Sequence, residues 1–204
     1  MRCTSQFEDE VRRQGFLRIA GVDEVGRGCL FGPVYAAAVI LDPQRPIRGL
    51  ADSKILMEDR REELANQIRA SAIAYAIGFA TAAEIDRINI LQASRLAMLR
   101  AVAAIQPACD YLLVDALTID FPVRQQALIK GDARVRSIAA ASIVAKVARD
   151  RLLVELDAQY PGYGMASHKG YPTPGHKAAL LRLGVTPLHR RSFAPVREVM
   201  QGTL

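Results

Sequence analysis

Apolar residues along the chain follow two spacings, one typical of buried strands and the other typical of helices. Short, nearly continuous apolar runs predict strands, whereas apolar residues that recur every three or four positions predict helices. The expected strands span residues 17–22, 34–41, 72–80, 111–114 and 127–129, and the expected helices span 58–70, 82–105, 137–158 and 176–183. This alternation favours a mixed α/β fold in which helices cover one sheet.

The longest helical pattern covers residues 82–105 and predicts one continuous helix. Its apolar stripe runs from Ile85 to Val102, and Pro107 follows its end. Turns rich in glycine, proline and histidine occupy most of the C-terminal stretch, which we expect to be a small appendage with one short helix. At 204 residues the chain is most simply one domain.

The first predicted strand ends in two adjacent carboxylates, Asp23 and Glu24, and a glycine-flanked arginine follows them. Carboxylates at the tip of a buried strand are costly unless they are paired or bound to metal, and a divalent cation relieves their mutual repulsion. Gly26 and Gly28 allow a ligand to approach the backbone closely, and Arg27 offers a planar cation suited to phosphate. The segment therefore predicts a site for a metal ion and a polyanion.

Further acids follow two other predicted strands: Asp115 after residues 111–114 and Asp132 after residues 127–129. Ligands of α/β sheets collect at the carboxyl ends of strands, so we expect these acids to meet the first pair. Asp23 and Glu24 can both reach that point only if the strand breaks between or just after them, because strand side chains alternate in direction. A turn or helix cap is the alternative role for Asp115, and more so for Asp132.

The expected cluster contains only hard oxygen ligands, without histidine or cysteine nearby, which favours Mg²⁺ or Mn²⁺ over Zn²⁺. Two such ions can activate a water and stabilise the leaving oxygen of a phosphodiester displacement. Asp150 follows Lys146 by one helical turn, so we expect an ion pair on the helix surface and keep this acid only as a reserve ligand.

Charge and cysteine content narrow the class of protein. The chain has 27 basic and 21 acidic residues, a net charge of +6 that permits a polyanionic partner but is equally compatible with ordinary solubility. Its three cysteines are too widely spaced for a disulfide framework or a metal motif and suit a reducing cytoplasm. Neither a signal core nor an apolar run of membrane-spanning length is present, so we expect a cytoplasmic protein without membrane attachment.

The glycine loop fits neither common nucleotide-binding motif. The dinucleotide pattern G-x-G-x-x-G fails because Phe31 stands where its third glycine belongs, and Gly32 comes one residue late. The P-loop pattern fails because Arg27-Gly28 stands where lysine and serine or threonine are needed.

An ordered series of motifs between residues 17 and 193 resembles one known family. The series comprises GVDEVGRG at 21–28, GPV at 32–34, DSK at 52–54, Asp115, KGD at 130–132, AASIVAKVARD at 140–150, HKGYPT at 168–173 and HRRSF at 189–193. In this order and spacing the chain resembles ribonuclease HII, the bacterial type 2 ribonuclease H family. Residues 1–16 would then form an N-terminal extension.

The resemblance implies a ribonuclease H-like fold: a central mixed five-stranded sheet flanked by helices, with a C-terminal helical segment. It implies endonucleolytic cleavage, dependent on Mg²⁺ or Mn²⁺, of the RNA strand of RNA–DNA hybrids. It also implies cleavage 5′ of single ribonucleotides embedded in duplex DNA, leaving 3′-hydroxyl and 5′-phosphate ends, as ribonucleotide removal requires. A monomer is expected, and no motif identifies a replication or repair protein that recruits it.

Family roles transfer to matching positions of this chain. The four metal-binding and catalytic carboxylates match Asp23, Glu24, Asp115 and Asp132. The loop that senses the ribose 2′-hydroxyl matches Gly26, Arg27 and Gly28, the tyrosine at the RNA–DNA junction matches Tyr171, and a basic residue near the phosphates matches Lys54. The 2′-hydroxyl is the group by which a protein distinguishes RNA from DNA at one site. His168 and His176 are either phosphate neighbours or turn residues.

At three places the sequence differs from residues that are frequent in the family. Cys29-Leu30 replaces the family's frequent Pro-Leu, Ile55 replaces a second lysine, and Ala116-Leu117 replaces the Gly-Asn of some members. We expect weaker phosphate contact and an altered loop beside Asp115, with activity retained.

The alternative functions are a catalytically silent nucleic-acid-binding module, a type 3 ribonuclease H, and a DNA resolvase. We expect no type 3 enzyme, because such enzymes typically carry an extra N-terminal domain and only 16 residues precede the first predicted strand.

Overall fold

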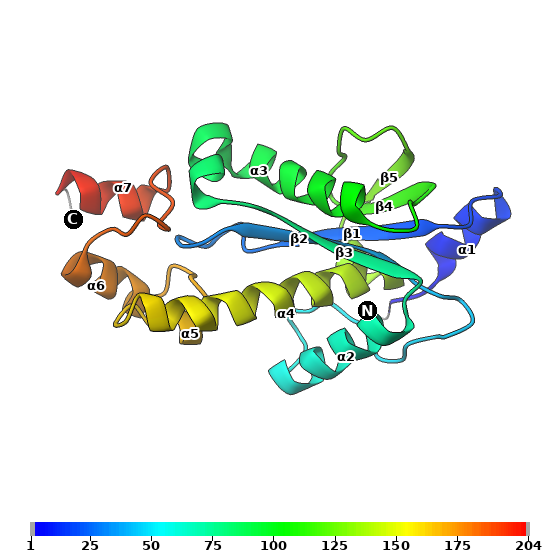
Figure 1. Ribbon diagram of the computed structural model, residues 1–204, viewed down its shortest axis with the longest axis horizontal. Helices are drawn as coiled ribbons and strands as arrows, with labels where there is room; N and C mark the ends of the chain where they lie inside the picture. Colours follow the sequence, from blue (N-terminus) through cyan, green and yellow to red (C-terminus); the bar gives the residue numbers. More distant parts are fainter. Residues whose placement is uncertain (1–2, 203–204) are drawn as a thin grey trace.

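The computed structural model describes residues 3–202 and contains one mixed five-stranded sheet with helices on both faces (Figure 1). Its strands are β1 (Ile19–Val25), β2 (Val34–Ile40), β3 (Ala74–Ala80), β4 (Tyr111–Asp115) and β5 (Arg124–Leu128), in the spatial order β3-β2-β1-β4-β5. β2 is antiparallel to both β1 and β3, whereas β1, β4 and β5 are parallel. The expected sheet is confirmed.

The helices form two layers and a C-terminal group. They are α1 (Gln6–Arg13), α2 (Glu58–Ser71), α3 (Ala82–Ala104), α4 (Arg136–Gln159), α5 (Met165–His168), α6 (Pro174–Leu183) and α7 (Ala194–Gln201), with a 3₁₀ turn, η1 (Gly131–Ala133), before α4. In Figure 1, α3 lies on one side of the sheet, α2 and α4 lie on the other, and α5, α6 and α7 gather near the end of α4. No helix within residues 3–202 is long and apolar enough to cross a membrane.

Strand β2 shows why its sequence is apolar at every position. Ala36 and Ala38 pack into the cluster that contains α3, whereas Ala37 and Val39 pack into the cluster that contains α2 and α4. Because both faces of this strand are covered, the usual alternation of apolar and polar residues disappears. The small alanine side chains leave room for a helix on each side.

Two glycines mark the closest approach of helix and sheet, one on each face. A Cβ atom on Gly21 of β1 would lie 2.1 Å from the carbonyl carbon of Ser137 in α4. A Cβ atom on Gly78 of β3 would lie 2.3 Å from the carbonyl oxygen of Ala97 in α3. The first glycine of the 21–28 motif is therefore required by packing, since it seats α4 against the strand that carries Asp23.

Helix α3 is not the continuous helix predicted for residues 82–105. Asn89 has φ of 65° and ψ of 165°, which interrupts the helical backbone. Its side-chain oxygen accepts hydrogen bonds from the backbone N–H groups of Leu91 (3.0 Å) and Gln92 (3.1 Å). This is the geometry of an N-cap, so asparagine starts a second helical segment inside the predicted one.

Elements at the chain ends and at the sheet edge differ from the prediction. The extension before β1 contains α1, in which the buried Glu8 accepts hydrogen bonds from the backbone N–H and hydroxyl of Ser137, both at 2.8 Å. Strand β5 spans residues 124–128 rather than 127–129, and it begins with the polar residues Arg124 and Gln125. An edge strand needs no apolar run, which explains the missed residues. Helices α5 and α7 were also not expected.

Candidate active site

Acidic side chains from three segments of the chain meet beside the central strands. Asp23 and Glu24 lie near the end of β1, Asp115 is the last residue of β4, and Asp132 lies in η1. Asp23 and Asp132 are buried, with 4% and 6% of their surface exposed. All four acids predicted from the sequence therefore lie at the carboxyl end of the parallel strands, where α/β folds place their ligands.

Strand pairing explains how the acids of β1 and β4 meet. Val22 lies opposite Val114 in the parallel pair, so Asp23 and Asp115 are the next residues on adjacent strands. Glu24 remains within β1, and the strand ends one residue later, at Val25. The break just after the two acids is the one that the sequence analysis required.

Burial and mutual repulsion perturb three of these carboxyl groups. Burial raises the pKa of Asp23 well above its usual value, and the charges of Glu24 and Asp115 raise it further. Burial also raises the pKa of Glu24, although Arg27 counteracts it. Burial raises the pKa of Asp115, the backbone N–H of Gly131 opposes that shift, and the charge of Asp132 reinforces it. A cluster in which carboxylates disfavour each other's charge is suited to a cation.

Each acid also has a fixed local partner. The backbone N–H of Glu24 donates to Asp23 Oδ1 at 2.8 Å, and the backbone N–H of Gly131 donates to Asp115 Oδ1 at 2.6 Å. A Cβ atom on Gly131 would lie 3.2 Å from the same Asp115 oxygen and 2.5 Å from Ile138. Gly131 thus lets η1 approach the end of β4 closely.

Two basic side chains neutralise part of the cluster. Arg27 Nη1 lies 3.2 Å from Glu24 Oε1, and Lys54 Nζ lies 3.1 Å from Asp132 Oδ2. Among residues 3–202, no three Asp, Glu, His or Cys side chains are already arranged around one point as a metal cage. The structure thus shows an arrangement in which Arg27 and Lys54 supply the counter-charge.

The donor set nevertheless fits a hard divalent cation. Its four side chains offer only carboxylate oxygens, the ligands that Mg²⁺ and Mn²⁺ prefer. Within the described chain, Glu24 Oε2 is buried and has no hydrogen-bond partner. A buried oxygen without a donor is costly, and a cation is one group that would satisfy it.

A groove of about 230 Å³ adjoins the acids and gathers every predicted substrate-binding residue. Its lining consists of Glu24, Val25, Gly26, Arg27, Gly28, Ser53, Lys54, Ser142, Lys146 and Tyr171. Tyr171 comes from the C-terminal segment, far in sequence from the loop that follows β1. The fold therefore brings the glycine loop, the tyrosine and Lys54 to one hollow beside the carboxylates.

Lys146 and Asp150 form the expected ion pair, but not on the helix surface. Lys146 Nζ lies 2.8 Å from Asp150 Oδ1, and their side chains are only 13% and 10% exposed. The same Nζ lies 5.8 Å from the centre of the Tyr171 ring, within reach of a cation–π contact. The predicted position on the surface was wrong because the C-terminal segment covers this part of α4. Asp150 pairs with Lys146 and does not join the acidic cluster.

The comparisons with known proteins agree with this geometry. The family model for ribonuclease HII matches residues 20–196. A curated ribonuclease HII from Solibacter usitatus (strain Ellin6076) is 58% identical over 196 residues, which cover 96% of this chain and 86% of the relative. The chain belongs to the ribonuclease HII family. Its members are metal-dependent endoribonucleases that cleave the RNA strand of RNA–DNA hybrids, and this enzyme shares that activity.

Solved structures share the ribonuclease HII fold. The ribonuclease H2 from Pyrococcus horikoshii OT3 superposes with a TM-score of 0.77 at 27% identity, over 92% of this chain and 99% of that one. The structure of Bst-RNase HIII in complex with Mn²⁺ superposes with a TM-score of 0.71 at 21% identity, over 92% of this chain and 70% of that one. The second likeness concerns the fold alone.

A departure from some ribonuclease HII sequences lies in the turn after Asp115. Ala116 has φ of 52°, in the left-handed region that favours glycine. Its N–H still donates to the carbonyl oxygen of Leu128 (3.1 Å), and the N–H of Leu117 donates to that of Asp115 (2.6 Å). Asp115 thus keeps its place at the end of β4, at a backbone cost of about 1 kcal/mol.

A fully buried arginine of α4, Arg149, holds the loop after β1 and was not assigned from the sequence. Its guanidinium donates to the carbonyl oxygens of Phe31 (3.1 Å), Pro33 (3.1 Å) and Lys169 (2.9 Å). A Cβ atom on Gly26 would lie 2.2 Å from Arg149 Nε, and Gly26 has φ of 87°. Glycine is therefore required there both by conformation and by the arginine beneath it.

A second fully buried arginine, Arg190, fixes the same loop from the C-terminal side. It donates to the carbonyl oxygens of Arg27 (2.8 Å) and Gly32 (2.9 Å), and its guanidinium lies 5.2 Å from the ring of Phe193. Burial lowers the pKa of Arg190 to about 10, so it stays charged at neutral pH. Both arginines lie inside motifs that carried the family resemblance, which was the available signal for them.

Two roles were open for His168 and His176: contact with phosphate or a part in turn structure. In the fold, His176 contacts the carbonyl oxygen of Tyr171, and His168 stacks on His176. His176 is fully buried, so it cannot contact a phosphate at the surface. His168 is half-buried, and its Nε2 donates to the carbonyl oxygen of Tyr163 at 2.7 Å. The two rings stack with their centres 4.4 Å apart. Both histidines thus contact protein groups.

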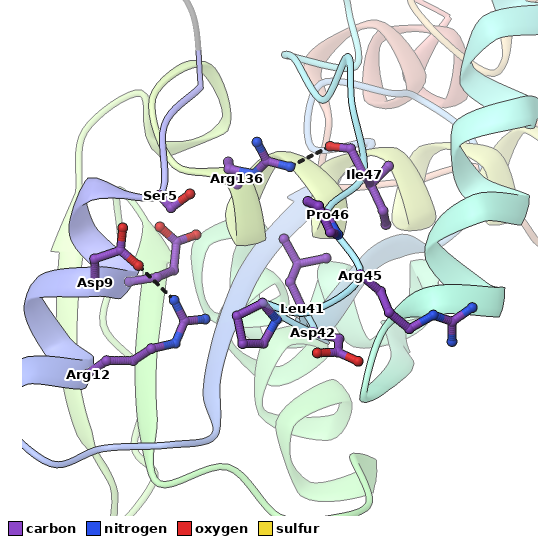
Figure 2. Close-up of a pocket in the computed structure, with 11 residues that line it drawn as sticks. Ser5, Asp9, Arg12, Leu41, Asp42, Arg45, Pro46, Ile47 and Arg136 are labelled. Atoms are coloured by element: carbon purple, nitrogen blue, oxygen red, sulfur yellow. Dashed lines mark hydrogen bonds and ion pairs between the residues drawn. The ribbon is translucent and has the colours of Figure 1, made fainter.

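A separate hollow of about 170 Å³ lies between α1, the chain after β2 and the start of α4 (Figure 2). Its charged groups are engaged with their neighbours: Arg12 pairs with Asp9 at 2.9 Å, and Arg136 donates to the carbonyl oxygen of Ile47. None of the predicted site residues lines it, so we assign it no part in the activity.

Proposed function

We propose that this enzyme cleaves on the 5′ side of a single ribonucleotide embedded in duplex DNA, as well as within RNA–DNA hybrids, and so acts in ribonucleotide removal. The observation that carries the proposal is the shared groove. Glu24, the Gly26–Gly28 loop and Tyr171 line one hollow, so a sugar held by the loop and the ring would lie beside the carboxylates.

The groove offers what a junction sensor needs. A Cβ atom on Gly28 would stand in open space, so its absence leaves the backbone there accessible to a 2′-hydroxyl, whereas the missing Cβ of Gly26 makes room for Arg149. The Tyr171 side chain is 37% exposed and can pack against the neighbouring sugar without reading base sequence. Arg27 and Lys54 can contact phosphates, since they are cations that line the hollow with 41% and 73% of their side chains exposed.

We assign the metal-holding role to Asp23, Glu24, Asp115 and Asp132, with Mg²⁺ or Mn²⁺ as the ion. The bound Mn²⁺ of the RNase HIII structure is consistent with this choice. When bound, two such ions supply an activated water and charge stabilisation of the leaving oxygen. Arg27 and Lys54 would bind the phosphates beside the scissile bond, and departure of the 3′-oxygen on attack by water would leave a 3′-hydroxyl and a 5′-phosphate end.

A duplex with one ribonucleotide tests the proposal. The labelled duplex is incubated with Mg²⁺, Mn²⁺ or EDTA, and the cut is mapped beside an all-DNA duplex and a long RNA–DNA hybrid. We expect one cut 5′ of the ribonucleotide with either metal and none with EDTA or all-DNA. Cleavage of the hybrid but not of the duplex with one ribonucleotide would refute the proposed single-ribonucleotide activity. Binding without a cut under any metal would favour the silent nucleic-acid-binding module.

Tyr171→Ala tests which part of the groove reads the junction. We expect a larger loss of kcat/KM on the single ribonucleotide than on the long hybrid, because only the former depends on recognising one sugar boundary. Equal losses on both substrates would remove Tyr171 from junction sensing. We also propose that the enzyme acts as a monomer, since every residue of the proposed site comes from one chain; light scattering measures this.

A further inference from the structure

All three histidines of the chain lie in one cluster, and His176 connects it to the backbone of Tyr171. The rings of His168 and His176 are stacked with centres 4.4 Å apart, and those of His176 and His189 lie 5.5 Å apart. His176 and His189 are 0% and 1% exposed. The proposed function uses none of them, although buried polar rings need defined hydrogen-bond partners.

Their partners fix which nitrogen of each ring carries hydrogen. His176 Nδ1 lies 2.9 Å from the carbonyl oxygen of Tyr171, which can only accept, so Nδ1 is the protonated nitrogen. His189 Nδ1 accepts from the backbone N–H of Thr186 at 3.0 Å, so this ring carries its hydrogen on Nε2. The two Nε2 atoms are 3.3 Å apart, and His189 therefore donates to His176.

The result is one directed chain of hydrogen bonds. It runs from the N–H of Thr186 through the rings of His189 and His176 to the carbonyl oxygen of Tyr171. Each ring accepts at one nitrogen and donates at the other, so both must be neutral for the chain to exist. Burial lowers the pKa of both rings, to about 4 for His189, which keeps them neutral at pH 7.

The same C-terminal segment also fixes the other half of the groove. Arg190, the residue after His189, donates through its side chain to the carbonyl oxygen of Arg27 and through its backbone to that of Leu30, both at 2.8 Å. The N–H of Leu30 in turn donates to the carbonyl oxygen of Gly170, also at 2.8 Å. The spacing between the glycine loop and Tyr171 is therefore set by neighbouring residues of one segment.

We propose that His176 and His189 are positioning residues that act through Tyr171, holding it at the distance from the Gly26–Gly28 loop that single-ribonucleotide recognition requires. The inference rests on the proposed role of Tyr171 in junction sensing. The histidines touch no substrate; they orient the backbone on which the sensing ring is mounted. Their loss should therefore change selectivity between substrates more than the chemical step.

Nitrogen-15 NMR of the histidine rings tests the chain of hydrogen bonds in the unmodified protein. At pH 7 we expect the rings of His176 and His189 to be neutral, with hydrogen on Nδ1 of His176 and on Nε2 of His189. A positively charged ring or the opposite tautomer at His176 or at His189 would overturn the proposal. This measurement requires no variant and stands even if a substitution prevents folding.

A pair of substitutions tests the functional consequence. His176→Leu removes the donor to Tyr171, whereas His176→Asn can keep a side-chain N–H close to the position of Nδ1. We expect His176→Leu to lower the ratio of kcat/KM on a single ribonucleotide to kcat/KM on a long hybrid about tenfold, the effect of one lost buried hydrogen bond. His176→Asn should restore most of that ratio. An unchanged ratio in folded His176→Leu would overturn the proposal.

Two further variants separate positioning from stability and from the proposed function. Tyr163→Phe removes a hydrogen bond to the carbonyl oxygen of Gly184 (2.7 Å) in the same segment but outside the chain, so it should lower the melting temperature without changing the ratio. In a Tyr171→Ala background, His176→Leu should no longer change the ratio; a persisting effect would show that His176 acts by another route. If Tyr171→Ala itself leaves the ratio unchanged, junction sensing fails, whereas a selective loss with Tyr171→Ala but none with His176→Leu rejects only the histidine chain.

Discussion

Asp23→Asn should remove cleavage and at the same time stabilise the metal-free protein. Asp23 is 4% exposed, and its pKa is raised by burial and by the charges of Glu24 and Asp115. A carboxyl whose folded pKa lies above its unfolded value costs stability when it is ionised, and it does so at pH 7. Asparagine keeps the shape and removes the charge. We expect the free energy of unfolding to rise by about 1–2 kcal/mol, in the range seen when buried charges are replaced.

The same change removes a proposed metal ligand at the centre of the cluster. We expect kcat to fall at least about 10³-fold, equivalent to about 4 kcal/mol of transition-state stabilisation. In EDTA the melting temperature should rise by about 2–4 °C for each kcal/mol gained. Added Mg²⁺ should then raise the melting temperature of the unmodified enzyme but not that of the variant, because only the former binds the ion tightly.

Calorimetry and cleavage of a long RNA–DNA hybrid measure the two effects on one sample. The exposed Asp120→Asn is the matched control and should change neither property. Turnover of Asp23→Asn close to that of the unmodified enzyme would refute the catalytic assignment. A lower melting temperature in EDTA would refute the electrostatic reasoning, because it would show that the Asp23 charge stabilises the fold.

Three other predictions follow from the surroundings of the site. Gly26→Ala should lower the free energy of unfolding by at least about 2 kcal/mol in a urea titration, because it strains φ of 87° and displaces Arg149; an unchanged midpoint would contradict this. Lys54→Met should raise KM and reduce the slope of affinity against salt by about one, and it should lower the free energy of unfolding by about 1 kcal/mol or more, because it leaves the buried Asp132 without its ion-pair partner; an unchanged slope would place Lys54 away from the phosphates. The pKa of His189 falls from 6.5 to about 4 on folding, so the unfolded chain binds this proton more tightly, and His189 should contribute a loss of about 3 kcal/mol to the free energy of unfolding between pH 7 and pH 4. The raised pKa values of Asp23, Glu24 and Asp115 act in the opposite direction, so urea unfolding of the unmodified protein and of His189→Gln across this range isolates the contribution as their difference; equal pH dependences would contradict it.

The central strands and the four acids could be predicted because their signals are local. Asp23 and Asp115 each follow an apolar run. The adjacent pair Asp23 and Glu24 is costly at a buried strand end unless it is paired or bound to metal, whereas for Asp115 alone a turn or helix cap stayed open until the sheet placed it beside Asp23. The sheet order was not needed to expect convergence, since carboxyl ends of parallel strands meet at one edge. The predicted helix over residues 82–105 failed only at Asn89, where a side chain caps the backbone from within the pattern.

Residues that act through long-range contacts could not be found in this way. Arg149 and Arg190 are charged, so a pattern of burial assigns them to the surface, yet both are fully buried. Their hydrogen bonds go to backbone carbonyls, and carbonyl partners leave no trace in the sequence. The tautomers of His176 and His189 likewise depend on a turn and a carbonyl that only the fold brings together.

The C-terminal segment, expected to be a small appendage, is part of the candidate site. The opening motif supplies Arg27 and its glycines, but a glycine loop alone has many accessible conformations. Arg149 donates to the carbonyl oxygen of Phe31, which follows the glycine loop, and to that of Lys169, which lies in the C-terminal segment. Arg190, also in the C-terminal segment, donates to the carbonyl oxygen of Arg27. These hydrogen bonds connect the loop after β1 to the C-terminal segment that carries Tyr171. Recognition of a single ribose would therefore depend on how the C-terminal helices dock against the first loop, whereas the carboxylates of β1 and β4 are placed by the sheet itself.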